Sequence, residues 1–319
     1  MRPTETDSDD TSTDYDVLVI GGGPAGLSAA LQLGRSLRSV LVCDDGDPRN
    51  GPAAEVHGYL TRDGIAPREL GRLGREEVAD YGGEFRDRRV TTVTKDQHGF
   101  TSTLDGDETV TTRKVVLATG VTDELPETDG FEELWGNGVY HCPYCHGYEV
   151  RDGALGVLIT DQHLIEYAKL ISNLSEDLVV FTDGHDVLDA DTRSAFADRG
   201  VEIEDEPIVA LTGTGDGLES VSLADGREIP RDALFYPPAM TQRADLVEEL
   251  GLEVTEAGLV EAERSGHGVG FTSIEGLFVA GDASALSALS VPAAAADGNV
   301  VGATVNMELS QEAFEHGEA

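Results

Sequence analysis

The sequence predicts an α/β protein built from two Rossmann-like, three-layer domains. A short apolar run at residues 15–20 leads into a glycine-rich turn and then into a helix-forming run at residues 27–33. A second alternation of apolar strand and helix begins near residue 153. Strands that alternate with helices along a chain are typical of parallel sheets covered by helices. The chain has 319 residues, which is enough for two such domains.

The first strand–turn–helix unit carries most of this prediction. Residues 15–20 form a continuous apolar run, as expected of a strand buried on both faces of a parallel sheet. The turn at residues 21–26 reads Gly-Gly-Gly-Pro-Ala-Gly, and a second strand at residues 39–43 ends at Asp44 and Asp45. This order of strand, glycine turn, helix, strand and acid is typical of a dinucleotide-binding unit.

Each glycine in this pattern has a physical reason. Gly21 permits the tight turn, Gly23 lets the backbone approach a pyrophosphate, and Gly26 allows the helix to pack close to the strand. The helix N-terminus then presents N–H groups and a partial positive charge to phosphate. Asp44, which lies 23 residues after Gly21, would accept hydrogen bonds from a ribose, with Asp45 as the alternative. A glycine turn without a ligand is the competing interpretation.

Further elements follow the same alternation. The pattern predicts helices at residues 70–81 and 163–173 and a small-residue helix after Pro292. Apolar runs predict the other strands, at residues 85–93, 100–104, 115–120, 154–159, 177–181, 233–236 and 276–282. Residues 123–138 are rich in proline, glycine and acids, which predicts a crossover between the two domains.

The charge of the chain excludes several classes of partner. There are 61 acidic and 22 basic residues, so the formal net charge is −39 at pH 7. Such a chain would repel the phosphates of nucleic acid and the headgroups of an anionic membrane, and neither is expected as a partner. High salt would screen the repulsion among these acids. We therefore expect a cytoplasmic protein of a salt-loving, halophilic organism.

We expect neither a membrane span nor a framework of disulfides. Residues 1–14 are rich in Thr, Ser and Asp, which predicts a disordered acidic tail rather than a signal peptide. No apolar run approaches the roughly 20 residues that a transmembrane helix needs. Only three cysteines occur, and Cys43 lies in an apolar run where a buried small hydrophobe is expected.

The other two cysteines lie in the segment His-Cys-Pro-Tyr-Cys-His at residues 141–146. Cys142 and Cys145 are separated by two residues, so they can close and reopen a small disulfide. His141 and His146 each flank a thiol and can carry a proton near neutral pH. The segment therefore predicts a two-thiol redox site.

Three other interpretations of this segment are open. Cys-Pro-Tyr-Cys is also the active tetrapeptide of glutaredoxins, but those are small single-domain proteins with the motif near the start of the chain. The two cysteines and two histidines are suitable zinc ligands by type, but adjacent residues point in divergent directions and no second Cys-x-x-Cys occurs. An inert structural disulfide is uncommon in a cytosolic chain.

Taken together, these motifs resemble the low-molecular-weight thioredoxin reductases, a family of FAD-dependent disulfide oxidoreductases (class II pyridine nucleotide-disulfide oxidoreductases). The likeness covers nearly the whole chain after residue 14. It rests on the glycine turn, the two-cysteine motif, Ala-Thr-Gly at residues 118–120 and Val-Ala-Gly-Asp at residues 279–282. More narrowly, residues 47–50, 57–58 and 142–149 look like the branch of dithiol oxidases, which close disulfides in small natural products.

The resemblance implies a discontinuous FAD-binding domain, residues 15–122 and 238–311. An inserted, degenerate NAD(P)-like domain, residues 123–237, would carry the redox cysteines. The resemblance also implies a homodimer.

The resemblance further implies which residues would contact FAD. By motif these are Gly21, Gly23, Ala25 and Gly26 at the pyrophosphate, Asp44 at the adenosine ribose, Asn50 and Thr119 near the cofactor, and Asp282 at the ribityl chain. The helix start around Ala293 would face the pyrimidine edge of the flavin, where its dipole would stabilise reduced flavin.

For the cysteines, the resemblance implies that Cys145 exchanges electrons with the flavin and that Cys142 exchanges with the substrate. A proton carrier must balance each disulfide step. We expect His146, which stands where ordinary thioredoxin reductases carry an acid, to be that carrier. His141 is the weaker candidate and could instead pack or cap.

The inserted domain departs from the family at its own nucleotide turn. After the strand at residues 154–159, Thr160, Asp161 and Gln162 stand where a glycine should meet a pyrophosphate, and Asp161 would repel phosphate. Residues 181–186 lack the arginines that would recognise a 2′-phosphate. We therefore expect an electron donor other than NADPH, and a divergent but working NAD(P)H site is the alternative.

Three functions fit these expectations. The first is reduction of a thioredoxin-like protein with electrons from a ferredoxin-like or other redox protein. The second runs in the opposite direction: a small dithiol reduces the Cys142–Cys145 disulfide, the flavin takes the electrons and oxygen removes them. The third is a non-catalytic flavin redox sensor, against which the retention of both thiols and His146 argues.

Overall fold

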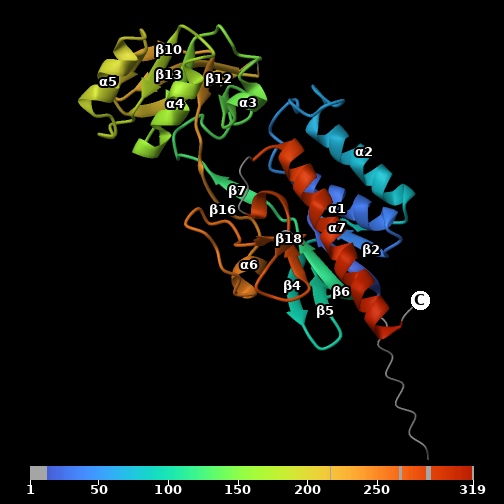
Figure 1. Ribbon diagram of the computed structural model, residues 1–319. Coiled ribbons are helices and arrows are strands. Elements are labelled where there is room, and N and C mark those ends of the chain that lie inside the picture. The colour runs from blue at the N-terminus through green and yellow to red at the C-terminus, as the bar shows by residue number, and fades with distance from the viewer. Residues whose placement is uncertain (1–12, 216, 266–267, 285–288, 318–319) are drawn as a thin grey trace, which may run out of the picture. The chain divides into compact units, whose positions relative to one another are not determined.

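The computed structural model describes residues 13–215, 217–265, 268–284 and 289–317. The chain divides into two compact units. Unit 1 comprises Met1–Pro48, Gly71–Val121 and Gln242–Ala319, and unit 2 comprises Arg49–Leu70 and Thr122–Thr241. Figure 1 shows the helices and strands of both. None of the helices in the described ranges has the length and apolar character that a membrane crossing requires.

Unit 1 is built on a nine-stranded sheet in the order β17-β18-β19-β6-β1-β2-β3, with β4 and β5 joined to it through β6. The pairs from β19 to β3 are parallel, whereas β5 and β18 pair in antiparallel fashion with β6 and β19. The strands are β1 (Tyr15–Ile20), β2 (Val40–Cys43), β3 (Glu84–Arg86), β4 (Val90–Lys95), β5 (Phe100–Leu104), β6 (Thr109–Leu117), β17 (Glu263–Ser265), β18 (Gly268–Phe271) and β19 (Leu277–Val279).

Both faces of this sheet are buried, as the continuous apolar runs predict. Along β1, Val17 and Val19 belong to one core cluster while Leu18 and Ile20 belong to another, because successive side chains point to opposite faces. The helices are α1 (Pro24–Arg35), α2 (Pro67–Asp80, which begins in unit 2 and enters unit 1 at Gly71), α6 (Leu246–Glu249) and α7 (Val291–His316), with a short 3₁₀ turn η2 (Gly281–Ala283). A Cβ at Gly298 of α7 would lie 1.9 Å from the Ala25 carbonyl oxygen, so glycine permits the close packing of α7 on α1.

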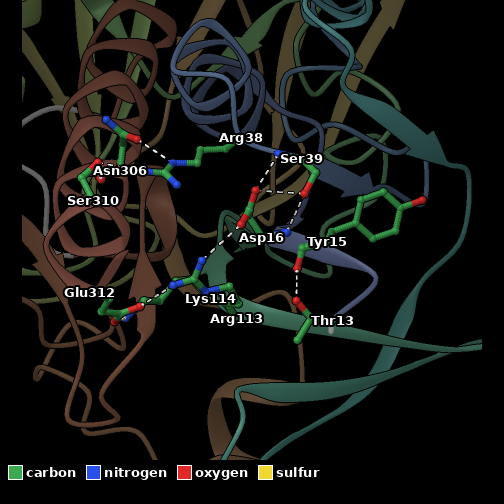
Figure 2. Close-up of polar contacts among 10 residues, drawn as sticks. All are labelled: Thr13, Tyr15, Asp16, Arg38, Ser39, Arg113, Lys114, Asn306, Ser310 and Glu312. Carbon is green, nitrogen blue, oxygen red and sulfur yellow. Dashed lines mark hydrogen bonds and ion pairs between the residues drawn. The ribbon is translucent and has the colours of Figure 1, made fainter. Parts of the chain in front are cut away.

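A polar network fixes the C-terminal half of α7 to the sheet (Figure 2). Lys114 of β6 is buried, and its Nζ lies 2.5 Å from Glu312 Oε1 and 2.9 Å from Glu308 Oε2. Arg38, just before β2, donates to Asn306 Oδ1 at 2.8 Å and to Ser310 Oγ at 2.7 Å. A buried cation needs paired acceptors of this kind, so the network holds α7 in register with the strands.

Unit 2 is a smaller α/β unit. Its five-stranded sheet is parallel and has the order β11-β10-β9-β15-β8. The elements are β8 (Val139–Tyr140), α3 (Pro143–His146), β9 (Leu155–Leu158), η1 (Gln162–Leu164), α4 (Ile165–Ile171), β10 (Leu178–Phe181), α5 (Ala190–Ala197), β11 (Glu202–Glu204) and β15 (Ala233–Phe235). A three-stranded antiparallel sheet contains β12 (Ile208–Thr214), β13 (Gly217–Leu223) and β14 (Glu228–Pro230). Strands β7 (Val121–Glu124) and β16 (Ala239–Gln242) pair where the chain passes between the units.

The parallel sheets in both units confirm the predicted α/β class, although several details differ. The strand predicted at residues 85–93 is divided into β3 and β4, and β11–β14 were not predicted. The predicted tail, residues 1–14, lies outside the described residues except for its end, where Asp14 exchanges hydrogen bonds with Thr111. Residues 49–70, which the resemblance assigns to the FAD-binding domain, pack with unit 2, and the domain bounds stay a prediction.

Candidate functional site

The glycine turn of unit 1 joins β1 to α1. Gly21 has a φ of +108°, and a Cβ there would lie 2.3 Å from the Ala118 carbonyl oxygen. A Cβ at Gly26 would lie 1.9 Å from the Gly21 carbonyl oxygen, so only glycine lets α1 approach the strand this closely. Gly23 is the N-cap of α1; it provides no side-chain cap, and a Cβ there would meet nothing within 4 Å. The start of α1 is therefore unblocked, as a phosphate site requires.

An acid stands beside this turn. Asp44 follows β2, and its Oδ1 accepts a hydrogen bond of 3.0 Å from the N–H of Gly22. Arg75 Nη1 lies 3.7 Å from the other oxygen of the same carboxylate. Asp45 instead pairs with Arg89 at 2.9 Å. The structure thus places Asp44, rather than Asp45, at the turn. It also shows that Gly22, a further member of the glycine run, contacts Asp44.

The carboxyl ends of β1, β6 and β19 meet at one edge of the sheet, because these strands are parallel neighbours. Thr119 follows β6 at this edge, and its buried Oγ1 has no hydrogen-bond partner among the described residues. Asp282 follows β19 within η2. A Cβ at Gly281 would lie 2.6 Å from Ala25 Cβ, so the start of α1 lies against the segment that carries Asp282. The fold therefore gathers Ala25, Thr119 and Asp282 around the glycine turn.

The start of α7 lies against η2, the segment that carries Asp282. Ser290 caps this helix, with its Oγ 3.4 Å from the backbone nitrogen of Ala293. Asp297, one turn further on, is buried and accepts hydrogen bonds from the N–H of Gly281 at 2.8 Å and from Arg264 at 2.7 Å. Sequence reasoning missed Asp297, although an acid inside a helix of small residues was a visible signal.

The redox segment of unit 2 follows β8. Cys142 and Cys145 form a disulfide with a Cα–Cα separation of 5.2 Å. Cys142 is the N-cap of α3, and its carbonyl oxygen accepts from the N–H groups of Cys145 and His146, each at 3.1 Å. Tyr144, inside the disulfide loop, is 80% exposed. The short helix thus fixes the two sulfurs and His146 on one turn of backbone, next to a tyrosine that is exposed to solvent.

His146 is half-buried, with both ring nitrogens shielded from solvent and an aromatic neighbour on its face. Its ring stacks on Tyr140 with centroids 4.6 Å apart and an interplanar angle of 14°. Neither ring nitrogen has a hydrogen-bond partner within the part of the chain that the structure describes. Burial lowers the pKa of His146 below its usual value, the nearby His57 lowers it further, and Glu149 opposes both. The imidazole is therefore neutral at pH 7 and able to accept a proton.

Residues 49–50 lie in the same unit, close to His141. Arg49 Nη2 pairs with Asp123 Oδ1 at 2.6 Å. Burial, followed by the charge of Arg49, lowers the pKa of His141 to about 4, and Asp123 opposes this. Asn50 lies in a turn, where its carbonyl oxygen accepts from the N–H of Ala53. Because Asn50 belongs to unit 2, its proposed place near the cofactor stays a prediction.

Unit 2 repeats the strand–turn–helix pattern at β9, but its turn is closed. Asp161 is the N-cap of η1, and its carboxylate accepts a hydrogen bond of 2.8 Å from the N–H of His163. A carboxylate thus caps the 3₁₀ turn that precedes α4, where a dinucleotide-binding turn would place glycine and a phosphate.

The next strand of unit 2 ends among paired acids. Thr182 Oγ1 donates to Asp205 at 2.8 Å, and Arg193 binds the same carboxylate through two nitrogens at 2.8 and 2.9 Å. Arg227 pairs with Glu204 at 2.5 Å. These arginines are engaged by acids rather than arranged to receive a 2′-phosphate.

The described residues contain no cluster of three or more His, Cys, Asp or Glu side chains that could hold a metal ion. The two sulfurs of the redox segment are bonded to each other, and Cys43 is buried in unit 1, where desolvation raises its pKa to about 12. Of the three cysteines, Cys142 and Cys145 therefore remain the candidate redox pair.

Comparison with known proteins agrees with these features. The family model of the pyridine nucleotide-disulphide oxidoreductases matches residues 15–317. Thioredoxin reductase sirT of Leptosphaeria maculans is 34% identical over 84% of this chain and 86% of its own length. Thioredoxin reductase tcpT of Claviceps purpurea is 32% identical over 94% of this chain and 95% of its own. The crystal structure of HlmI superposes with a TM-score of 0.87 at 39% identity and covers 95% of this chain and 94% of that one.

These matches confirm the predicted family, and proteins of this family bind FAD. The chain belongs to the pyridine nucleotide-disulphide oxidoreductases, as an enzyme of the thioredoxin reductase-like, low-molecular-weight class of flavin oxidoreductases.

Proposed function

We propose that unit 1 holds FAD at the edge where its parallel strands end. Gly21, Gly23, Ala25 and Gly26 would receive the pyrophosphate, and Asp44, which holds the N–H of Gly22, the adenosine ribose. Thr119, Asp282 and the start of α7 at Ala293 would receive the flavin end, and Asn50 stays a candidate from the resemblance alone. Support comes from the open N-cap at Gly23 and the buried, unpartnered Oγ1 of Thr119. FAD supplies the capacity to take up or release an electron pair.

We infer that the enzyme passes electrons between FAD and the Cys142–Cys145 disulfide, and on to a thioredoxin-like protein. The observation that carries this proposal is a closed disulfide on the same short helix as His146. Cys142 would exchange with the partner and Cys145 with the flavin, while neutral His146 would accept or return the proton. A non-catalytic sensor would need none of these groups.

The donor proposed here is not NADPH but another redox carrier, such as a ferredoxin-like protein. The carboxylate of Asp161 takes the helix N–H that a pyrophosphate would need, and Arg193 is committed to Asp205. Placing a phosphate there would set like charges together and break the cap, and both changes oppose binding.

The carboxylate of Asp161 at the nucleotide turn of unit 2 also favours a second candidate, an oxygen-dependent dithiol oxidase. Without a nicotinamide site, electrons can enter at the disulfide itself, from a small dithiol, and leave to oxygen. The resemblance of residues 47–50, 57–58 and 142–149 to the dithiol oxidase branch points the same way.

A dithiol added to the FAD-loaded protein without oxygen should bleach the flavin, and the Cys142→Ser variant should not respond. Formation of peroxide with turnover in air selects the dithiol oxidase. Bleaching with no turnover in air, combined with reduction of a thioredoxin by a ferredoxin-like donor, selects the reductase. If a dithiol does not bleach the flavin of the wild-type protein, both the reductase and the dithiol oxidase are contradicted, and the non-catalytic sensor is left.

We propose a homodimer that associates through α7. Val300, Met307 and Phe314 are exposed and recur every seven residues, so they form one apolar stripe along this helix. The charge of −39 opposes self-association, so the dimer should strengthen with salt. Sedimentation in low and high salt tests this, and a Met307→Glu variant should remain a monomer. The charge also supports the cytoplasm of a halophilic organism as the proposed location.

A further inference from the structure

A second histidine, His57, lies beside His146 in unit 2. The two rings meet edge to face, with centroids 6.3 Å apart and an interplanar angle of 89°. His57 comes from the segment before α2, whereas His146 ends α3. The fold therefore brings two imidazoles together from distant parts of the chain, and the mechanism above uses only one of them.

His57 is surrounded by carboxylates at both ring nitrogens. Its Nε2 lies 3.3 Å from Glu55 Oε2 and 3.6 Å from Glu149 Oε1, and its Nδ1 lies 3.6 Å from Asp63 Oδ1. The side chain of His57 is 14% exposed, while that of Asp63 is 71% exposed. His57 thus stands between a shielded imidazole and acids that reach solvent.

A base shielded from solvent that takes up a proton must also release it before it can act again. When a dithiol opens the disulfide, one of its thiols loses a proton and its sulfur bonds to Cys142. The Cys142–Cys145 bond breaks, and Cys145 leaves as a thiolate, so electrons balance without a further reagent. The proton goes to His146, whose ring nitrogens make no direct hydrogen bond to another described residue, His57 included, so a bridging water or a turn of the ring must carry the proton onward.

We propose that His57 is the outlet through which His146 exchanges this proton with solvent, with Glu55, Glu149 and Asp63 as the outer acceptors. His57 acts through His146 and is a positioning residue, not a catalytic one. The inference rests on the proposed function, since it concerns thiol exchange at the same disulfide. The other titratable groups that face the pair are Tyr140, stacked on His146, and the nearby His141.

The test measures how fast dithiothreitol opens the disulfide in the FAD-loaded protein without oxygen, across pH. Alkylation of Cys142 and Cys145, located by mass spectrometry, reports the opening. His57→Ala should slow it about tenfold near neutral pH, below the full contribution of a general base, because His146 is still present. Free imidazole should restore much of the loss by filling the space that the side chain left. His98→Ala, an exposed histidine in the β4–β5 turn of unit 1, is the matched control and should match wild type.

A double-mutant cycle separates an outlet from a structural role. If the two histidines act in series, His57→Ala should add little to the loss already caused by His146→Gln. Additive losses, a loss that imidazole does not restore, or equal rates for His57→Ala and wild type at every pH would each overturn the inference.

A further variant covers the case in which His57→Ala does not fold. Glu55→Gln combined with Glu149→Gln keeps both imidazoles but replaces the carboxylates at His57 Nε2 by neutral amides that do not take up a proton, and it should slow opening about threefold. An unchanged rate would overturn the inference. A wild-type disulfide that dithiothreitol does not open at any pH would instead overturn the proposed function, and the role of His57 with it.

Discussion

Both units of this enzyme contain a strand–turn–helix pattern, but the turn is open in unit 1 and occupied by a side chain in unit 2. In unit 1, β1 leads to Gly23, an N-cap without a side chain at the entrance of α1. In unit 2, β9 leads to Asp161, whose carboxylate already holds the N–H of His163. The residue at the helix entrance thus decides whether the helix N–H groups face a phosphate or a side chain of the protein itself.

The largest expected effect comes from adding one methyl group to the open turn. Gly26→Ala would place a Cβ 1.9 Å from the Gly21 carbonyl oxygen, so α1 would have to move away from the strand. We expect loss of FAD from the purified protein and about 3 kcal/mol less stability, as overpacking of a close contact gives. The ratio of flavin to protein absorbance and urea unfolding measure both.

The control is a glycine without such a neighbour. Gly71 lies in α2, and a Cβ there would meet nothing within 4 Å. Gly71→Ala should keep FAD and gain about 0.5–1 kcal/mol, because alanine suits a helix better. If Gly26→Ala retains its full content of FAD, the turn of unit 1 does not need this close packing to bind the cofactor.

Copying the closed turn into the open one should remove the cofactor without harming the fold. Gly23→Asp would put a carboxylate at the N-cap of α1, where a Cβ meets nothing within 4 Å. The carboxylate would cap the helix and repel the pyrophosphate, so we expect FAD to bind about 100-fold more weakly, or roughly 3 kcal/mol, with stability of the apoprotein unchanged or higher. Fluorescence titration of the apoprotein with FAD checks this. Unchanged affinity would mean that the pyrophosphate does not lie there.

The units should also differ in how they respond to acid, because unit 2 buries neutral histidine. The pKa of His141 is lowered to about 4 in the folded protein. Above the ordinary value near pH 6.5 the group is neutral in both states, and its contribution to stability is fully present. Between pH 6.5 and 4 the unfolded chain takes up a proton that the folded chain does not, so stability should fall by roughly 3 kcal/mol.

The variant His141→Gln should lack this contribution. Urea unfolding of both proteins across this pH range isolates it, because the effects of the many carboxylates are shared and cancel in the difference. Parallel curves for the two proteins would contradict the burial of a neutral imidazole at this position.

The smallest effect is expected from opening the closed turn. Asp161→Ala should cost about 1 kcal/mol through loss of a helix cap. Asp189→Ala, which removes the matching cap on Thr192 at the start of α5, is the matched control and should lower stability in the same direction. Neither variant should bind NADPH, because the turn still lacks glycine and Arg193 stays paired with Asp205. If Asp161→Ala binds NADPH tightly and Asp189→Ala does not, the side chain of Asp161 by itself blocks the nucleotide site of unit 2.

The features that sequence reasoning recovered are local ones. The glycine turn, the strand before it and Asp44 follow one another along the chain, and each has a steric reason to be where it is. Both the α/β class and the family followed from such local motifs. The cysteine pair was equally visible, because Cys142 and Cys145 are placed by a single helical turn.

What sequence reasoning missed depends on contacts between distant segments. Residues 49–70 lie in unit 2 because Arg49 pairs with Asp123 and His57 lies against His146, and neither contact has a local signature. Strands β12–β14 are amphipathic and carry polar residues, so they gave no continuous apolar run. The sequence places Asp297 in the predicted C-terminal helix, but it does not show that its carboxylate accepts a hydrogen bond from Gly281.

The contrast between the two turns is tested most directly by anaerobic titration of the FAD-loaded wild-type enzyme with NADPH and, separately, with a dithiol. The dithiol should bleach the flavin, and NADPH at the same concentration should leave its spectrum unchanged. Bleaching by stoichiometric NADPH would contradict the account, because it would require a nicotinamide nucleotide to bind where Asp161 closes the helix.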